Sequence, residues 1–361
     1  MPAPAPANLA PRQRAPLLVL GFVALVAGTG AGLVRMGWEL PTPFAMLVAL
    51  HGPLMICGFF GTVISLERAV ALGRLWAYAA PLAAGLATLA LLASMEPAAR
   101  WLYVAGGAVL LAATLVILAR QFALFTFTLA IGAAAWLAGS ALWAAGHAVH
   151  EVVPWWIAFL VLTIGGERLE LSRLRPPSAT AVRVFAALLA ACVAGLAASG
   201  TGWGGPLFAA ALLALAAWLA RQDVARRTVH GKGLTRFIAV ALLSGYAWLA
   251  IGSAIALAAG GFAPGTRTYD AALHALLVGF VFSMVFGHAP IIFPAVLRVQ
   301  LPYHPVFYLP LVLLHASVAL RLAGDALADA GLLRWGGAAS ALALAVFIGT
   351  MAVSALRRPG R

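Results

Sequence analysis

Long apolar runs alternate with short polar stretches along the whole chain. A helix needs about twenty mainly apolar residues to cross a bilayer, so runs of that length predict membrane spans. The pattern predicts about twelve transmembrane helices, at residues 16–34, 43–66, 75–95, 99–119, 123–146, 152–171, 181–199, 203–220, 236–259, 270–296, 303–323 and 333–356. We therefore expect an all-α polytopic membrane bundle at 16–356, with a disordered N-terminal tail at 1–15 and a basic C-terminal tail at 357–361.

Composition and charge agree with a membrane protein. Apolar residues make up 64% of the chain and charged residues only 9%, whereas about a quarter of a soluble protein is charged. Lys and Arg collect on the cytoplasmic side of short loops, and about twelve spans place all but five of the 23 on the side of both termini. The exceptions are Arg35, Arg100, Arg267, Arg321 and Arg334. We predict a multi-pass protein of the bacterial inner membrane with both termini cytoplasmic. The net charge of +13 then reflects topology and attraction to anionic lipid in the bilayer, not nucleic acid.

Two histidines lie in the apolar segment from Tyr269 to Arg298. An imidazole that faces lipid has no polar partner, so such histidines usually face the bundle interior and meet a metal, a proton or a polar neighbour. His274 and His288 are fourteen residues apart, which in a regular α-helix brings them to within about 40° of one face and separates them by roughly 21 Å. We expect both in one seam, at different depths.

A third histidine, His51, lies in the second predicted helix among glycines and small residues. The plain interpretation is a close helix contact with His51 as a hydrogen-bonded core residue. With His274 in the same periplasmic half of the bilayer, however, the pair suits axial ligation of a b-type haem, because small residues let the flat macrocycle lie between helices. Arg321 and Arg334 are candidate partners for the propionates. His288, His304 and His315 are candidates for a second, deeper site.

One further group has the residue types of a metal site. His147, His150 and Glu151 follow the fifth predicted helix, and if they share a helical face, two imidazoles and a carboxylate could bind copper or zinc. The alternative is a set of ordinary polar residues in a periplasmic loop. Cys57 and Cys192 have no paired spacing that would hold zinc or an iron–sulfur cluster, so we expect them to be small apolar packing residues.

Two stretches resemble subunit I of the haem–copper oxidases. LHGPLMICGFF is similar to the HG-x-x-M stretch of that family's second helix, whose histidine, here His51, ligates the low-spin haem. HALLVGFVFSM resembles its tenth helix, which supplies the opposing ligand, here His274. The resemblance implies a pseudo-threefold layout of twelve helices. The sixth predicted helix has no histidine and the seventh lacks the adjacent histidine pair, so the copper site of that family is absent.

A closer resemblance is to the NnrS family of twelve-helix membrane proteins. Its pattern H-A-L-x-V-G-x-x-x-x-M is matched here by His274, Ala275, Leu276, Val278, Gly279 and Met284. An arginine, Arg298, follows this segment, as it does in that family, whereas HGPLM stands where the family usually has HEMLFG. The resemblance implies haem, with copper as a further cofactor, and a role in the response to nitric oxide.

These observations predict a haem-binding protein of a nitric-oxide or denitrification-linked response, or of membrane electron transfer. Its partners would be a quinol or a redox protein, with nitric oxide as the candidate ligand. One alternative is a proton- or metal-coupled transporter that uses the intramembrane histidines. Another is a quinol-linked or assembly subunit whose histidines are core residues. We recognise no complete oxidase or reductase site, catalytic triad or phosphate-binding loop, so the sequence favours a non-enzymatic role and leaves enzyme, sensor and transporter open.

Overall fold

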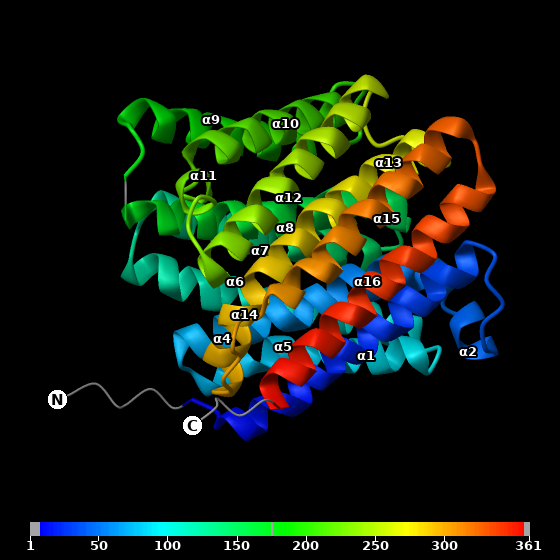
Figure 1. Ribbon diagram of the computed structural model, residues 1–361, viewed down its shortest axis with the longest axis horizontal. Helices are drawn as coiled ribbons and strands as arrows, with labels where there is room; N and C mark the ends of the chain where they lie inside the picture. The colour runs from blue at the N-terminus through cyan, green and yellow to red at the C-terminus, as the bar shows by residue number, and fades with distance from the viewer. Residues whose placement is uncertain (1–7, 175, 357–361) are drawn as a thin grey trace. The chain divides into compact units, whose positions relative to one another are not determined.

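The protein is helical throughout the residues that the computed structural model describes, 8–174 and 176–356. Among these residues twelve helices are long and apolar enough to cross a membrane, and no strand occurs, which confirms the predicted fold class (Figure 1). They are Pro11–Arg35, Val48–Leu72, Leu75–Leu92, Glu96–Arg120, Leu124–Ala144, Val149–Leu171, Ala179–Ala197, Gly204–Gln222, Gly233–Ala258, Arg267–Leu297, Pro305–Leu327 and Ala330–Leu356. The chain is a multi-pass membrane protein. Its orientation in the membrane and the kind of membrane in which it lies stay predictions.

The first helix, α1 (Pro11–Arg35), begins earlier than hydropathy predicts. Residues 11–15 of the expected tail are helical, because Pro11 occupies the first helical position, where its missing N–H needs no partner. Residues 1–7 and the predicted C-terminal tail, 357–361, lie outside the described residues.

Polar caps and one glycine define other helix ends. The Ser178 hydroxyl accepts from the Ala181 amide at 3.2 Å and starts α9 (Ala179–Ala197). Gly73, with φ of +64°, ends α4 (Gly61–Leu72) in the left-handed conformation that glycine adopts without a steric penalty.

Two spans contain a π-helical segment that begins within three residues after a histidine. In the second span, α3 (His51–Pro53) leads into η2 (Leu54–Phe60). In the tenth, α13 (Arg267–His274) leads into η5 (Ala275–Phe282), before α14 (Ser283–Leu297). A π-turn closes its hydrogen bond over one more residue than an α-turn. The regular count of 100° per residue therefore fails across η5, which corrects the argument that placed His274 and His288 on one face.

The chain forms two compact units, of which the first runs to Gly166 and includes Ala295–Arg298. Besides α1, η2 and α4 it holds α5 (Ala79–Leu92), α6 (Glu96–Arg120), α7 (Leu124–Ala144) and most of α8 (Val149–Leu171). Helix α6 packs against both α5 and α7. A Cβ atom on Gly132 would stand only 3.2 Å from the Phe159 carbonyl oxygen, so this glycine lets α7 and α8 approach closely.

The second unit comprises Glu167–Pro294 and the residues from Val299 onward. It holds α9, α10 (Gly204–Gln222), α11 (Ala225–Thr228), α12 (Gly233–Ala258), α13, η5, most of α14, η6 (Pro305–Phe307), α15 (Tyr308–Leu327) and α16 (Ala330–Leu356). The last two helices pack along each other, orange and red in Figure 1. Phe286 stacks on Phe347 with ring centroids 3.9 Å apart, which joins α14 to α16.

Candidate functional site

His51 is held by the backbone of α1 within the first unit. Its Nδ1 lies 2.7 Å from the carbonyl oxygen of Gly28. Because a carbonyl oxygen can only accept, Nδ1 carries the hydrogen and Nε2 carries the lone pair. A Cβ atom on Gly32 would stand 2.8 Å from the ring's Cε1, so a glycine is needed for the imidazole to lie against α1. The ring has a fixed tautomer whose Nε2 has the electronic form of a metal ligand.

The π-helical segment η2, which follows His51, packs tightly around Gly58. A Cβ atom on this glycine would stand 2.8 Å from the Ala24 Cβ and 2.9 Å from the Thr88 hydroxyl oxygen. Helices α1 and α5 therefore approach the backbone of η2 closely. Segments of π-helix are rare and occur often at functional sites, so η2 marks the surroundings of His51 as a candidate site.

His274 has the same hydrogen-bond arrangement in the second unit. Its Nδ1 lies 2.8 Å from the backbone oxygen of Asp270, one turn earlier, and 3.4 Å from that residue's Oδ1. Nδ1 again donates its hydrogen to a carbonyl, and Nε2 again carries the lone pair. The two histidines thus have the same tautomer. Each donates to a backbone carbonyl, and each precedes a π-helical segment of its own.

Asp270 is in turn held by Arg321 of α15. The Arg321 Nε and Nη2 donate to the two carboxylate oxygens at 2.8 and 3.0 Å, a bidentate pair. Asp325, one helical turn after Arg321, interacts electrostatically with both residues. Among the described residues its Oδ2 is buried and has no hydrogen-bond partner. Arg321, which we expected beside a propionate, is therefore shared by two carboxylates.

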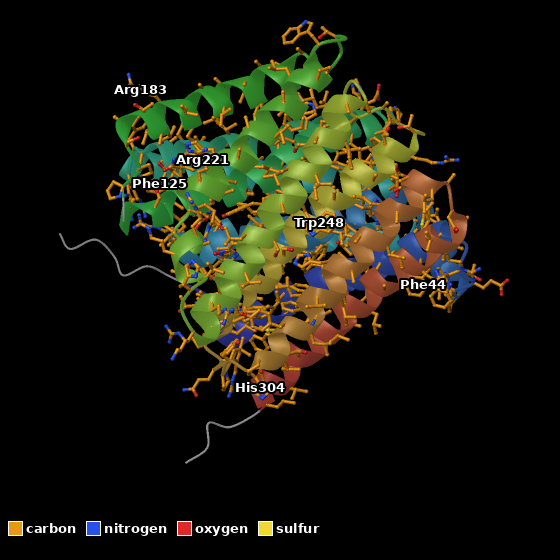
Figure 2. The ribbon with its side chains drawn as sticks, turned by 45° about the horizontal axis from the view of Figure 1, so that its top comes forward. Phe44, Phe125, Arg183, Arg221, Trp248 and His304 are labelled. Carbon is orange, nitrogen blue, oxygen red and sulfur yellow. The ribbon has the colours of Figure 1, made fainter. Side chains whose placement is uncertain are left out.

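The other two predicted cofactor residues of α15 and α16 differ in their surroundings. The His315 Nδ1 accepts from the Trp248 indole N–H at 2.8 Å, and its Nε2 donates to the Ser244 hydroxyl at 2.9 Å. Trp248, labelled in Figure 2, lies on α12. Both nitrogens of His315 are thus engaged by protein groups. Arg334 lies exposed near the start of α16.

His288, on α14, carries a buried nitrogen without a partner. Its Nδ1 lies 2.6 Å from the Met284 carbonyl oxygen, which again leaves the lone pair on Nε2. Among the described residues, that Nε2 has no hydrogen-bond partner and is sealed from solvent. The Arg168 side chain interacts with it electrostatically. His288 therefore presents a buried lone pair that none of the described groups satisfies.

Arg168 belongs to a buried charged cluster that we did not predict. Its Nη1 lies 4.0 Å from the Asp223 Oδ2, and both side chains are almost fully buried. Asp223 also accepts from the Tyr246 hydroxyl at 2.5 Å and from the Ala225 amide at 2.8 Å. Asp223 follows α10 in a strongly basic stretch, where an acid typically pairs with solvated neighbours. Its one distinguishing signal in the sequence is a position three residues after the predicted span 203–220.

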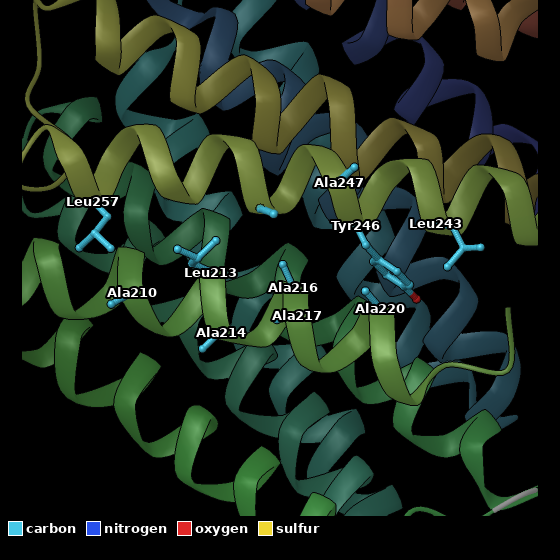
Figure 3. A pocket seen from close by; sticks show the side chains of 11 residues that line it. Ala210, Leu213, Ala214, Ala216, Ala217, Ala220, Leu243, Tyr246, Ala247 and Leu257 are labelled. Atoms are coloured by element: carbon cyan, nitrogen blue, oxygen red, sulfur yellow. The ribbon is translucent and has the colours of Figure 1, made fainter. Parts of the chain in front are cut away.

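An apolar groove runs beside this cluster, between α10 and α12. It has a volume of about 450 Å³ and is lined mainly by alanine and leucine. Tyr246 forms part of its wall, and Figure 3 shows the hydroxyl directed toward the end of α10. The aromatic ring separates the apolar groove from the carboxylate of Asp223.

The predicted copper or zinc site at His147, His150 and Glu151 has a different arrangement. Gly146, with φ of +104°, ends the α7 turn, so His147 precedes α8 while the other two lie in its first turn. The Glu151 carboxylate accepts from the Ala148 amide at 2.7 Å and caps this helix. Within the described ranges, no group of three or more His, Cys, Asp or Glu residues is placed to hold a metal ion.

Residues 14–356 match the family described as Domain of unknown function (DUF8744). No curated protein matches the sequence.

Proposed function

The chain belongs to the DUF8744 family, and from its site we propose that it is a haem-binding membrane protein. His51 and His274 are the proposed axial ligands of a b-type haem iron. The resemblance of their segments to the NnrS and haem–copper oxidase patterns is consistent with this assignment.

One observation carries the proposal. Each imidazole donates its Nδ1 hydrogen to a backbone carbonyl, at 2.7 Å for His51 and 2.8 Å for His274. Metal-bound histidines are usually held in this way, because the hydrogen bond fixes the tautomer and makes the other nitrogen more basic. The two rings are prepared for the same chemistry by different helices.

The residues around His274 have defined roles in this proposal. Haem, when bound, supplies a one-electron couple and an iron that takes a diatomic ligand if an axial position opens. Asp270 orients His274, and Arg321 orients Asp270 through two hydrogen bonds. Arg321 is therefore a positioning residue, and Arg334 remains the proposed partner of a propionate. A haem held by these residues would exchange electrons with a quinol or a redox protein, or would bind nitric oxide.

The test is a pyridine haemochrome assay with reduced-minus-oxidised spectra on the purified full-length protein. We expect haem in the wild type, and its loss or a changed axial spectrum in both His51→Ala and His274→Ala. His304→Ala is the matched control, because this exposed histidine accepts from the Val306 amide, before η6. Folded wild type without haem, or haem unchanged in both variants, contradicts the proposal.

A second candidate function is proton transfer coupled to transport, favoured by the cluster of Arg168, Asp223 and Tyr246. The side chain of Asp223, directly after α10, is buried beside a guanidinium and a phenol, as in membrane proton pathways. Proteoliposomes with an internal pH dye test this function. Proton uptake by wild type that is lost in Asp223→Asn supports it, and equal dye traces from protein-containing and empty vesicles exclude it.

A further inference from the structure

The apolar groove between α10 and α12 opens to the outside of the second unit. Its volume is about 450 Å³, and Figure 3 shows the side chains that line it. Ala214, Ala217 and Ala247 of this lining are exposed. Both helices are candidate membrane spans, so the groove opens toward the hydrocarbon region of the bilayer. Its occupant there is apolar, because that region holds no water.

The dimensions of the groove fit one hydrocarbon chain in one leaflet. Its lining runs from Ala210 to Ala220 on α10 and from Leu243 to Leu257 on α12, which is about 15 Å and about 21 Å at the rise of an α-helix. One leaflet contributes about 15 Å of the hydrocarbon core. A volume of about 450 Å³, at roughly 30 Å³ for each water-sized group, corresponds to about fifteen methylene groups.

Two exposed arginines continue the lining faces of both helices at one end of the groove. On α10, Arg221 follows Ala217 by four residues, and on α12, Arg236 precedes Leu243 by seven. Each arginine therefore lies on the groove face of its helix. The helices pack along each other and are joined by residues 223–232, so both arginines lie at the same end. Figure 2 labels Arg221 there.

The charge at this end is positive and the neighbouring acid does not offset it. The Arg226 Nη1 donates to the Arg221 carbonyl oxygen at 3.1 Å, which brings a further exposed guanidinium to the end of α10. Asp223, the one acidic residue between Arg221 and Arg236 in the sequence, is buried and accepts from the Tyr246 hydroxyl. The predicted topology places this end on the cytoplasmic side, where the leaflet is rich in anionic lipid.

We propose that the groove binds one acyl chain of an anionic phospholipid, whose phosphate is bound by Arg221, Arg226 and Arg236. A guanidinium presents paired donors that match phosphate oxygens, whereas the headgroup of a zwitterionic lipid would bring its own positive charge beside the arginines. The acyl chain contributes apolar contact along the groove. The Tyr246 hydroxyl in its wall already donates to Asp223, so the wall recognises the chain by shape and apolarity. The site is independent of the proposed haem ligands.

Native mass spectrometry of the delipidated full-length protein, titrated with two lipids of identical chains, tests the proposal. Dioleoyl phosphatidylglycerol should bind about tenfold more tightly than dioleoyl phosphatidylcholine. The double variant Arg221→Gln with Arg236→Gln should lose most of this preference. Ala217→Phe, which occupies part of the groove, should weaken binding of both lipids. The matched controls are Arg120→Gln, at the exposed last residue of α6, and Ala187→Phe, at an exposed alanine of α9.

The headgroup and the acyl chain are tested separately. Equal affinities of the wild type for the two lipids, or an unchanged preference in the arginine double variant, overturn the proposal. Unchanged lipid binding in Ala217→Phe overturns it as well, because the chain then lies elsewhere. So does displacement of the lipid by an equal concentration of inorganic phosphate, or a quinone extracted with the wild type and absent from Ala217→Phe. The arginine substitutions change exposed side chains and should leave the fold intact, so the headgroup test does not depend on Ala217→Phe.

Discussion

Loss of Arg321 should destabilise the second unit more than loss of Asp270, its partner in an ion pair. Removing one partner of a buried pair costs about 3–5 kcal/mol, because the other charge stays buried without compensation. The side chain of Asp270 is 25% exposed while that of Arg321 is 6% exposed, so solvent moderates this cost. We expect Arg321→Met to lower the free energy of unfolding by about 2–3 kcal/mol, since it leaves both Asp270 and Asp325 without this guanidinium.

Asp270→Asn should cost less, about 1–2 kcal/mol, because Asp325 stays beside Arg321 and compensates part of its charge. The double variant should be less destabilised than the sum of the two single variants, since residues in one network do not act additively. Unfolding of the purified protein in detergent, followed by tryptophan fluorescence, measures all three. Arg183→Met, at an exposed arginine on α9, controls for loss of positive charge. Equal costs of the single variants, or strict additivity, would refute the reasoning.

Three further predictions concern packing and hydrogen bonding. Gly58→Ala should destabilise the protein by about 1–3 kcal/mol, because its Cβ would stand 2.8 Å from Ala24 Cβ. Gly349→Ala, where a Cβ would meet nothing within 4 Å, should raise the free energy of unfolding by about 0.5–1 kcal/mol. Unfolding curves that rank the two variants in the opposite order contradict the packing. His315→Phe should cost about 1–3 kcal/mol by leaving the Trp248 indole without its acceptor, with haem content unchanged in the haemochrome assay; lost haem would make His315 a ligand. Ala217→Leu should leave the Tm of the delipidated protein unchanged, because the groove of about 450 Å³ accommodates the larger side chain. A clear drop in the Tm would show that the groove is already filled.

Hydropathy predicted the spans well because the length of an apolar run is a property of the sequence alone. The helix from Arg267 to Leu297 illustrates both the success and its limit. Its apolar length is evident, but the π-helical segment within it is not, because the same residues are compatible with either hydrogen-bond register. A spacing argument that assumes a regular α-helix therefore failed at that segment.

The histidines were found because a polar ring in an apolar run is conspicuous, but their partners were not. His51 and His274 bond to backbone carbonyls, which every residue has and which no sequence pattern distinguishes. Asp223 was missed for a related reason. Its basic neighbours suggested a solvated loop, while its burial depends on Tyr246 and Arg168, which are distant in sequence and meet it only through helix packing.

The π-helical segments η2 and η5 also affect how relatives of this chain should be compared. A wide turn accommodates one residue more than an α-turn while the helix continues on both sides. A relative that forms a regular α-helix there needs one residue fewer between the same flanking positions. Its sequence then aligns correctly only with a one-residue gap inside a transmembrane helix, at Leu54–Phe60 or Ala275–Phe282. An alignment that forbids gaps within spans would shift every position on one side of His51 or His274 and would conceal the equivalence of the histidines themselves.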